Sequence, residues 1–228
     1  MNNNALLTTT EIETAPNPTA AIIWMHGLGA DSSDFVPLVP ELDLTGCGPI
    51  RFVFPDAPVI PVSVNNGYRM RAWYDIIGGF DLDDHREEDE TGLRASQAAI
   101  ERLIARELER GIRSERIVVA GFSQGCAMTL QTGLRHPQAL AGLLCLSGYL
   151  PLSETVAAER APANQKTPIF MAHGLVDNVV PLDRAEKSRD ILTALGYQVQ
   201  WQSYQMAHSV NAQEVVDISK WLQSVLGG

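Results

Sequence analysis

Two patterns of apolar and polar positions alternate along the chain. Runs in which nearly every residue is apolar, or in which apolar and polar residues alternate, predict strands at 20–25, 50–55, 115–120, 140–147, 167–174 and 197–204. Between them, apolar residues at helical spacing or runs of small and apolar residues predict helices at 91–110, 124–135, 182–195 and about 211–225. Apolar strands separated by helices indicate a mostly parallel sheet with helices on both faces.

The predicted parallel sheet indicates where chemistry belongs. Ligands of open α/β sheets bind beyond the carboxyl ends of the strands, so reactive side chains are expected just after strands. Two helix starts carry capping signals. Asn211 and Glu214 resemble a capping box, and Asp183, which follows a proline-leucine pair, is expected to cap the helix over 182–195.

The segment DLDDHREEDE, residues 81–90, has seven acidic residues in ten. Clustered carboxylates raise the possibility of a cation site, but the spacing does not match an EF-hand loop. We expect a solvated loop that leads into the next helix, whose N-terminal dipole tolerates acidic side chains.

Composition narrows the class of protein. The chain has 228 residues and 45% hydrophobic content, which suits one α/β domain over residues 1–228, with two small domains as the alternative. Its net charge of −10 and its isoelectric point near 4.9 argue against nucleic acid as a partner and against bulk-charge binding to anionic lipid.

Cysteine usage and the start of the sequence bear on location. Three cysteines without a CxxC pair favour reduced thiols in the cytoplasm over a disulfide framework or a zinc site. Residues 1–19 lack the basic and apolar regions of a signal peptide, and no apolar run is long enough to predict a membrane span. We therefore expect a cytoplasmic protein without integral membrane association.

The first candidate for chemistry is Ser123, in the stretch IVVAGFSQGCAM. Gly121 and Gly125 stand two residues to either side, which matches the G-x-S-x-G pattern of a nucleophile elbow. In an elbow the serine takes a strained conformation at a strand-to-helix turn, and the glycines avoid collisions with the neighbouring backbone. The alternative is a plain Ser-Gly turn, but the preceding apolar strand and the following helix favour the elbow.

A serine nucleophile needs a base, and five histidines are available. In α/β-hydrolases the base follows the serine and the acid in chain order. His136 lies at the far end of the helix over 124–135, where we expect it to interact with the helix dipole. His173 ends a strand and is expected to form a structural hydrogen bond. His208 lies in a loop directly after the strand over 197–204, which is the place predicted for a base.

The base in turn needs a carboxylate to orient it. Asp177 and Asp183 both lie between the last two predicted strands. Asp177 follows Gly174 in the loop directly past a strand, whereas Asp183 opens a helix. We therefore predict Asp177 as the acid, a role that is compatible with an Asx turn in the same loop.

Backbone N–H groups are expected to stabilise the oxyanion that forms during ester cleavage. One should belong to Gln124, the residue after the predicted nucleophile. The other should belong to Leu28, because Gly27 and Gly29 let the loop after the first buried strand turn inward. His26 is expected to hydrogen-bond within this loop. A phosphate-binding glycine loop is the alternative, but the G-x-G-x-x-G and Walker patterns are missing.

Five ordered motifs, HGLGADSSDF, RAWYD, GFSQGCAM, HGLVDNVVP and MAHSV, together resemble the carboxylesterase/acyl-protein thioesterase (phospholipase/carboxylesterase) family of α/β-hydrolases. The resemblance implies an α/β-hydrolase fold without a large cap domain, a shallow apolar acyl groove, and matches to the triad and to both oxyanion donors. It also implies that Trp73 lies near the groove, although packing in the core is an equal alternative. Leu175 and Val176, beside Asp177, are candidates for an apolar wall.

These residues predict a serine hydrolase that cleaves carboxylic esters through an acyl-enzyme. An acyl-protein thioesterase or a lysophospholipase would use the same triad of Ser123, Asp177 and His208. The expected substrate is a small-molecule acyl ester or thioester, without metal or organic cofactor, and a homodimer is possible. The alternative from another class is a binding or receptor module on the same fold. Such modules usually lose a triad residue, and this sequence keeps all three.

Overall fold

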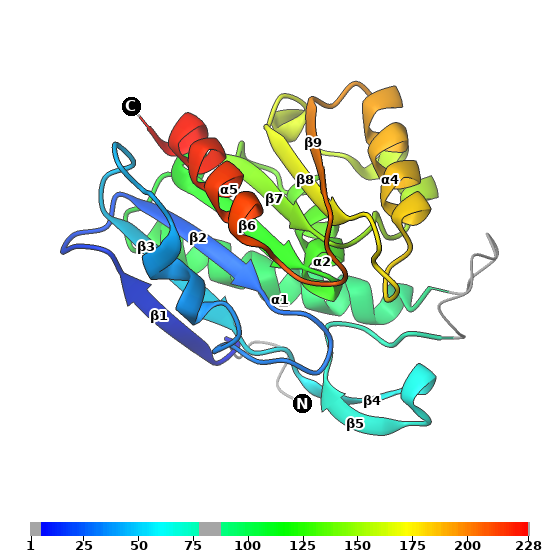
Figure 1. Ribbon diagram of the computed structural model, residues 1–228. Coiled ribbons are helices and arrows are strands. Elements are labelled where there is room, and N and C mark those ends of the chain that lie inside the picture. The colour runs from blue at the N-terminus through cyan, green and yellow to red at the C-terminus, as the bar shows by residue number, and fades with distance from the viewer. Residues whose placement is uncertain (1–5, 78–87, 228) are drawn as a thin grey trace.

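The structure is a computed structural model that describes residues 6–77 and 88–227. Its centre is a seven-stranded sheet in the order β1-β3-β2-β6-β7-β8-β9 (Figure 1). β1 pairs with β3 in antiparallel fashion, and all other neighbours are parallel. The strand bounds are Thr9–Glu13, Ala20–Met25, Ile50–Pro55, Ile117–Phe122, Gly142–Leu146, Ile169–Gly174 and Val199–Tyr204 for β1, β2, β3, β6, β7, β8 and β9.

Helices cover both faces of the sheet, because the central strands are apolar on both sides. In β2, Ala21, Ile23 and Met25 join a core cluster on one face, and the alternate residues join a cluster on the other. The first cluster includes side chains of α1 (Glu90–Glu109), α2 (Gln124–Gly133) and α4 (Leu182–Ala194). The second includes side chains of α5 (Ala212–Leu226), which lies across the sheet from α1 (Figure 1).

Shorter elements fill the connections. A hairpin of β4 (Val59–Val62) and β5 (Tyr68–Arg71) stands apart from the main sheet. The one-turn helix α3 spans Val156–Glu159, and 3₁₀ helices span Val36–Glu41, Ser63–Asn65, Ser114–Arg116, Ser153–Thr155 and Pro162–Asn164. In the described part of the chain, no large cap domain covers the carboxyl edge of the sheet.

α5 is tied to the segment after the first 3₁₀ helix. Ser219 Oγ accepts a hydrogen bond from the backbone N–H of Asp43 at 3.1 Å. Gln223 Nε2 donates to the carbonyl of the same residue at 2.9 Å. Trp221 and Leu222 of α5 join the same core cluster as Val39 of that 3₁₀ helix. The first 3₁₀ helix is therefore held against the sheet by residues about 180 positions later in the chain.

All six predicted strands and all four predicted helices are confirmed, with ends shifted by up to two residues. β1 was not predicted, because TTEIE carries little apolar content. Its place depends on pairing with β3 and on ion pairs from Glu11 to Arg106 and Arg110 of α1.

The capping predictions had mixed outcomes. Asn211 caps α5, since its side chain accepts the N–H of Glu214 at 2.9 Å. The prediction for Asp183 is wrong. The extended backbone of Pro181 makes that residue the N-cap of α4, so the helix begins at Leu182 and Asp183 lies inside its first turn. Asp183 instead accepts the N–H of Arg184 at 2.8 Å.

The acidic segment lies outside the described residues over 78–87. At its described end, Asp89 caps α1 by accepting the N–H of Gly92 at 2.8 Å, as expected of a loop that leads into a helix.

Candidate active site

The turn between β6 and α2 places Ser123 at the carboxyl end of the sheet. Its backbone has φ 56° and ψ −116°, a conformation that costs of order 1–3 kcal/mol for a residue other than glycine. A Cβ at Gly121 would collide with the backbone of Gly125, and one at Gly125 would collide with the Met25 carbonyl. The Ser123 N–H donates to the Leu146 carbonyl at 2.8 Å, which anchors the strained turn to the neighbouring strand.

Asp177 and His208 meet at the same edge of the sheet, from the loops after β8 and β9. The Nδ1–H of His208 donates to Asp177 Oδ2 at 2.6 Å. The two loops are also joined through their backbones, since the N–H of Val176 donates to the Met206 carbonyl. This arrangement fixes the imidazole with its Nδ1 toward the carboxylate, which leaves Nε2 free for a second partner.

The Asp177 carboxylate is buried but well supplied with donors. Its Oδ1 accepts the N–H groups of Val179 and Val180 at 2.8 and 2.9 Å. Burial by itself would raise the pKa of this carboxyl. The hydrogen bonds from His208 and from the two backbone N–H groups outweigh burial, so the pKa lies below its usual value. The Asp177 carboxyl therefore carries its charge at neutral pH.

The elbow and the Asp177–His208 pair are adjacent. The ring of Phe122, the residue before Ser123, packs against the His208 ring with 4.7 Å between centroids. His208 remains partly accessible, with 15% of its side chain exposed, and Ser123 is 9% exposed. The three residues predicted as a triad thus follow the ends of β6, β8 and β9. In the sheet, β8 and β9 are neighbours, and β7 lies between β6 and β8.

The loop after β2 approaches the elbow from the other side. A Cβ at Gly27 would lie 3.4 Å from Ser123 Cβ, so this loop contacts the serine. The N–H groups of Leu28 and Gln124 have no acceptor in the described part of the chain. Two free donors beside a serine are what an oxyanion site requires. The N-terminal end of α2 adds its positive dipole at the same place.

Side chains around these donors hold the backbone in place. The Gln124 side chain accepts the N–H of Trp73 and donates to the Tyr74 carbonyl, both at 2.8 Å. The His26 Nδ1–H donates to the Gly27 carbonyl at 2.6 Å, and its Nε2 accepts the N–H of Ala57 at 3.1 Å. The expected role of His26 within the loop is therefore confirmed. Burial lowers its pKa, in keeping with a neutral ring.

The residues predicted to contact substrate lie in different surroundings. Trp73 is 1% exposed, packs beside His26, and donates from Nε1 to the His26 carbonyl at 2.9 Å. Its ring supports the loop after β2 and does not line the open groove described below. Leu175 and Val176 are 38% and 63% exposed beside Asp177, so their apolar surfaces are accessible.

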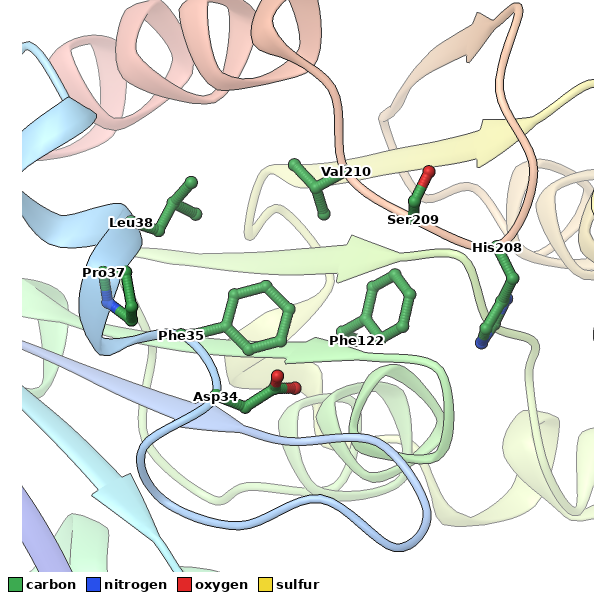
Figure 2. Close-up of a pocket in the computed structure, with 8 residues that line it drawn as sticks. All are labelled: Asp34, Phe35, Pro37, Leu38, Phe122, His208, Ser209 and Val210. Carbon is green, nitrogen blue, oxygen red and sulfur yellow. The ribbon is translucent and has the colours of Figure 1, made fainter.

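A groove of about 400 Å³ opens beside His208 (Figure 2). Its lining residues are Asp34, Phe35, Pro37, Leu38, Phe122, His208, Ser209 and Val210. Sequence reasoning missed this wall. Phe35 and Phe122 lie within the motifs HGLGADSSDF and GFSQGCAM. The signal for the groove wall was therefore an aromatic residue in each motif that strand packing did not account for.

The two other histidines that follow Ser123 are used structurally. His173 donates from Nε2 to the Val180 carbonyl at 2.8 Å, which confirms its structural role, and burial lowers its pKa. The expected interaction of His136 with the dipole of α2 stays a prediction. α2 ends at Gly133, and the contact seen for the His136 ring is a 2.6 Å hydrogen bond between Nδ1 and Glu101 of α1.

Two kinds of feature are missing from the described residues, 6–77 and 88–227. They contain no group of three or more His, Cys, Asp or Glu side chains arranged to hold a metal ion. None of their helices combines the length and apolar character that crossing a membrane requires.

The sheet order, the elbow and the Asp177–His208 hydrogen bond are those of the serine α/β-hydrolase class of enzymes. A model of the phospholipase/carboxylesterase family matches residues 8–226. The chain therefore belongs to the phospholipase/carboxylesterase family.

Individual relatives agree with this family. The chain is 41% identical to acyl-protein thioesterase 1 of Gibberella zeae over 219 residues, which cover 93% of each protein. It is 32% identical to a probable carboxylesterase of Oryza sativa, over 90% of this chain and 77% of the relative. The crystal structure of Zea mays acyl-protein thioesterase 2 superposes with a TM-score of 0.85 at 29% identity, over 96% of this chain and 99% of that structure.

Proposed function

We propose that the protein hydrolyses carboxylic esters through an acyl-enzyme on Ser123, with His208 as general base and Asp177 as the acid that orients it. The observation that carries this proposal is the 2.6 Å hydrogen bond from His208 Nδ1 to a buried, charged carboxylate beside a strained elbow serine. A binding module has no need for a base held in one tautomer next to a serine.

The first half of the reaction forms the acyl-enzyme. Ser123 Oγ attacks the acyl carbonyl carbon while His208 Nε2 takes the hydroxyl proton. The carbonyl oxygen becomes an oxyanion, which the N–H groups of Leu28 and Gln124 stabilise. When the intermediate collapses, the bond to the leaving oxygen or sulfur breaks, and the imidazolium of His208 returns its proton to the leaving group.

The second half restores the enzyme. Water gives a proton to His208 and attacks the acyl carbon. The carboxylic acid product then leaves as Ser123 Oγ regains the proton. The negative charge of Asp177 stabilises the imidazolium in both halves, which is why its low pKa matters.

Thioesters are a second substrate class for the same machinery. The names of the relatives, which include acyl-protein thioesterases and a probable carboxylesterase, support both oxygen and sulfur leaving groups. A lysophospholipid is an oxygen ester that the same triad would cleave. We would rank these classes by kcat/KM, measured for matched oxygen esters and thioesters over a series of acyl lengths.

The first test replaces the proposed nucleophile. Ser123→Ala should lower kcat for p-nitrophenyl butyrate by more than about 10³-fold, since the loss of the nucleophile stops acyl transfer. Ser203→Ala, an exposed serine of β9, is the matched control and should keep full activity. A fluorophosphonate probe should label the wild type and the control but not Ser123→Ala. Full turnover by Ser123→Ala would overturn the proposal, and an unlabelled, inactive wild type would favour the binding module.

Three further expectations stay predictions from the sequence: a single domain over residues 1–228, a cytoplasmic location and a possible homodimer. Sedimentation velocity over a hundredfold range of concentration tests the homodimer directly.

A further inference from the structure

The position of His208 within the groove bears on which half of the substrate the groove receives. His208 stands in the wall of the groove, with Ser209 and Val210 beyond it (Figure 2). In the proposed function, His208 must reach the leaving oxygen or sulfur to protonate it. A leaving group within reach of Nε2 therefore extends along this wall. This reasoning rests on the proposed function and adds to it the chemistry of the leaving group.

Asp34 gives the groove a charge that the protein does not neutralise. In the described part of the chain its carboxylate forms no ion pair and accepts no hydrogen bond. The neighbouring acid, Asp31, is by contrast occupied by the N–H and the hydroxyl of Ser33. Figure 2 shows the Asp34 carboxylate on the side where the rings of Phe35 and Phe122 lie. Desolvation raises the pKa of Asp34, and the charge of Asp31 adds to this rise, while His26 acts in the opposite direction.

Aromatic rings form the floor beside this carboxylate. Phe35 stacks on Trp24 at 5.1 Å, contacts Phe122 at 5.6 Å, and Phe122 in turn contacts His208 at 4.7 Å. A row of ring faces beside an unpaired carboxylate is the arrangement that binds quaternary ammonium groups through cation–π attraction and counter-charge. The net charge of −10 adds a field that draws cations toward the protein.

We propose that this groove binds the leaving group and favours one that carries a quaternary ammonium, with Asp34 as its counter-charge and Phe35 and Phe122 as its aromatic floor. The preferred substrates are then choline-type esters or thioesters, in which a short arm joins the cation to the leaving oxygen or sulfur. An acyl chain has no use for a carboxylate, whereas a cationic arm gains from both features of the groove. Asp34 acts here as a specificity residue and takes no part in bond breaking.

The test uses two thioesters that differ only in charge. Butyrylthiocholine and S-(3,3-dimethylbutyl) thiobutyrate have the same shape, since a carbon replaces the quaternary nitrogen, and the thiol released by either is measured with one reagent. The wild type should show a kcat/KM about tenfold higher for the cationic substrate. Asp34→Asn should bring this ratio close to one by lowering the rate for the cation alone. Phe35→Leu, which keeps apolar volume and removes the ring face, should lower the ratio about threefold.

Controls separate the groove from the field and from the catalytic machinery. Glu41→Gln removes one exposed charge of a residue that does not line the groove and should leave the ratio unchanged. A wild-type ratio near one, equal loss for both substrates in Asp34→Asn, or the same effect from Glu41→Gln would each overturn the proposal. Turnover of p-nitrophenyl butyrate by the wild type reports on the proposed function separately, because its leaving group carries no ammonium.

Discussion

Two carboxylates flank His208 in the chain and end up in opposite states. The side chain of Asp177 is fully buried and receives hydrogen bonds from His208 and two backbone N–H groups, and its pKa falls below the usual value. Glu214, in the first turn of α5, is equally buried, but neither oxygen has a hydrogen-bond partner in the described part of the chain. Burial raises the pKa of Glu214 to about 8.

The comparison shows that donors decide the charge of a buried acid. Desolvation is the largest influence on both groups and acts in the same direction. The N–H of Asn211 lies close enough to lower the pKa of Glu214 somewhat, and the charge of Asp217 raises it further. Asp177 is built to keep a charge that an imidazolium can use. Glu214 is neutral at pH 7 and fills its site as an uncharged side chain.

Removing the charge of Asp177 should have the largest effect on activity. Asp177→Asn keeps the shape of the side chain, but its amide can present N–H where His208 Nδ1–H needs an acceptor. We expect kcat/KM for p-nitrophenyl butyrate to fall about 10³- to 10⁴-fold, since the imidazole loses its tautomer and its counter-charge. Asp183→Asn, an exposed acid of α4, is the control and should keep full activity. Near-normal kcat/KM in Asp177→Asn would show that the carboxylate does not orient the base.

Glu214 should make the stability of the protein depend on pH. Its pKa is raised in the folded protein, so its contribution is fully present below about pH 4.5 and is lost as the pH rises through about 8. The cost of ionising Glu214 is on the order of a few kcal/mol. Glu214→Gln removes this titration. The stability of the variant relative to wild type should therefore increase as the pH rises from 5 to 9. Urea unfolding at several pH values measures the difference, and parallel curves for the two proteins would contradict the expected titration.

Removing the N-cap of α5 at Asn211 should have a smaller effect, on stability alone. Its side chain accepts the N–H of Glu214 at 2.9 Å, so Asn211→Ala leaves this donor unpaired and should cost about 1 kcal/mol of unfolding free energy. Asn211→Ser restores an acceptor and should recover most of the loss. Thermal unfolding of the three proteins at pH 7 measures the effect. A stability loss shared equally by both variants would show that the cap is not the cause.

The sequence was most informative where chemistry coincides with local structure. Ser123, Asp177 and His208 each follow an apolar run, and the parallel-sheet rule places the ends of such runs at one edge. The contact between Asp177 and His208 followed from that rule. Gly121 and Gly125 were predictable from the G-x-S-x-G pattern. The collision at Gly121 is local to the turn, whereas the one at Gly125 is with the Met25 carbonyl of the neighbouring strand.

Features that depend on distant partners were not predictable in the same way. β1 is defined by pairing with β3 and by arginines of α1, which its own five residues do not reveal. The Nδ1 of His136 bonds to Glu101, 35 residues earlier, a partner that the sequence around His136 does not reveal. The burial of Trp73 and the groove beside Phe35 arise from how separate loops pack, which a pattern along one chain does not encode.

The attachment of α5 to Asp43 has a consequence for the order in which the protein becomes competent during synthesis. One wall of the groove is formed by residues 34–38, and the other by residues 208–210 directly before α5. A nascent chain that has released residues 1–177 from the ribosome already carries Leu28, Ser123, Gln124 and Asp177. It still lacks His208, the second groove wall and the helix that holds the first wall through Asp43. The proposed hydrolysis therefore requires residues 208–226, which contribute His208 and fix the segment after the first groove wall.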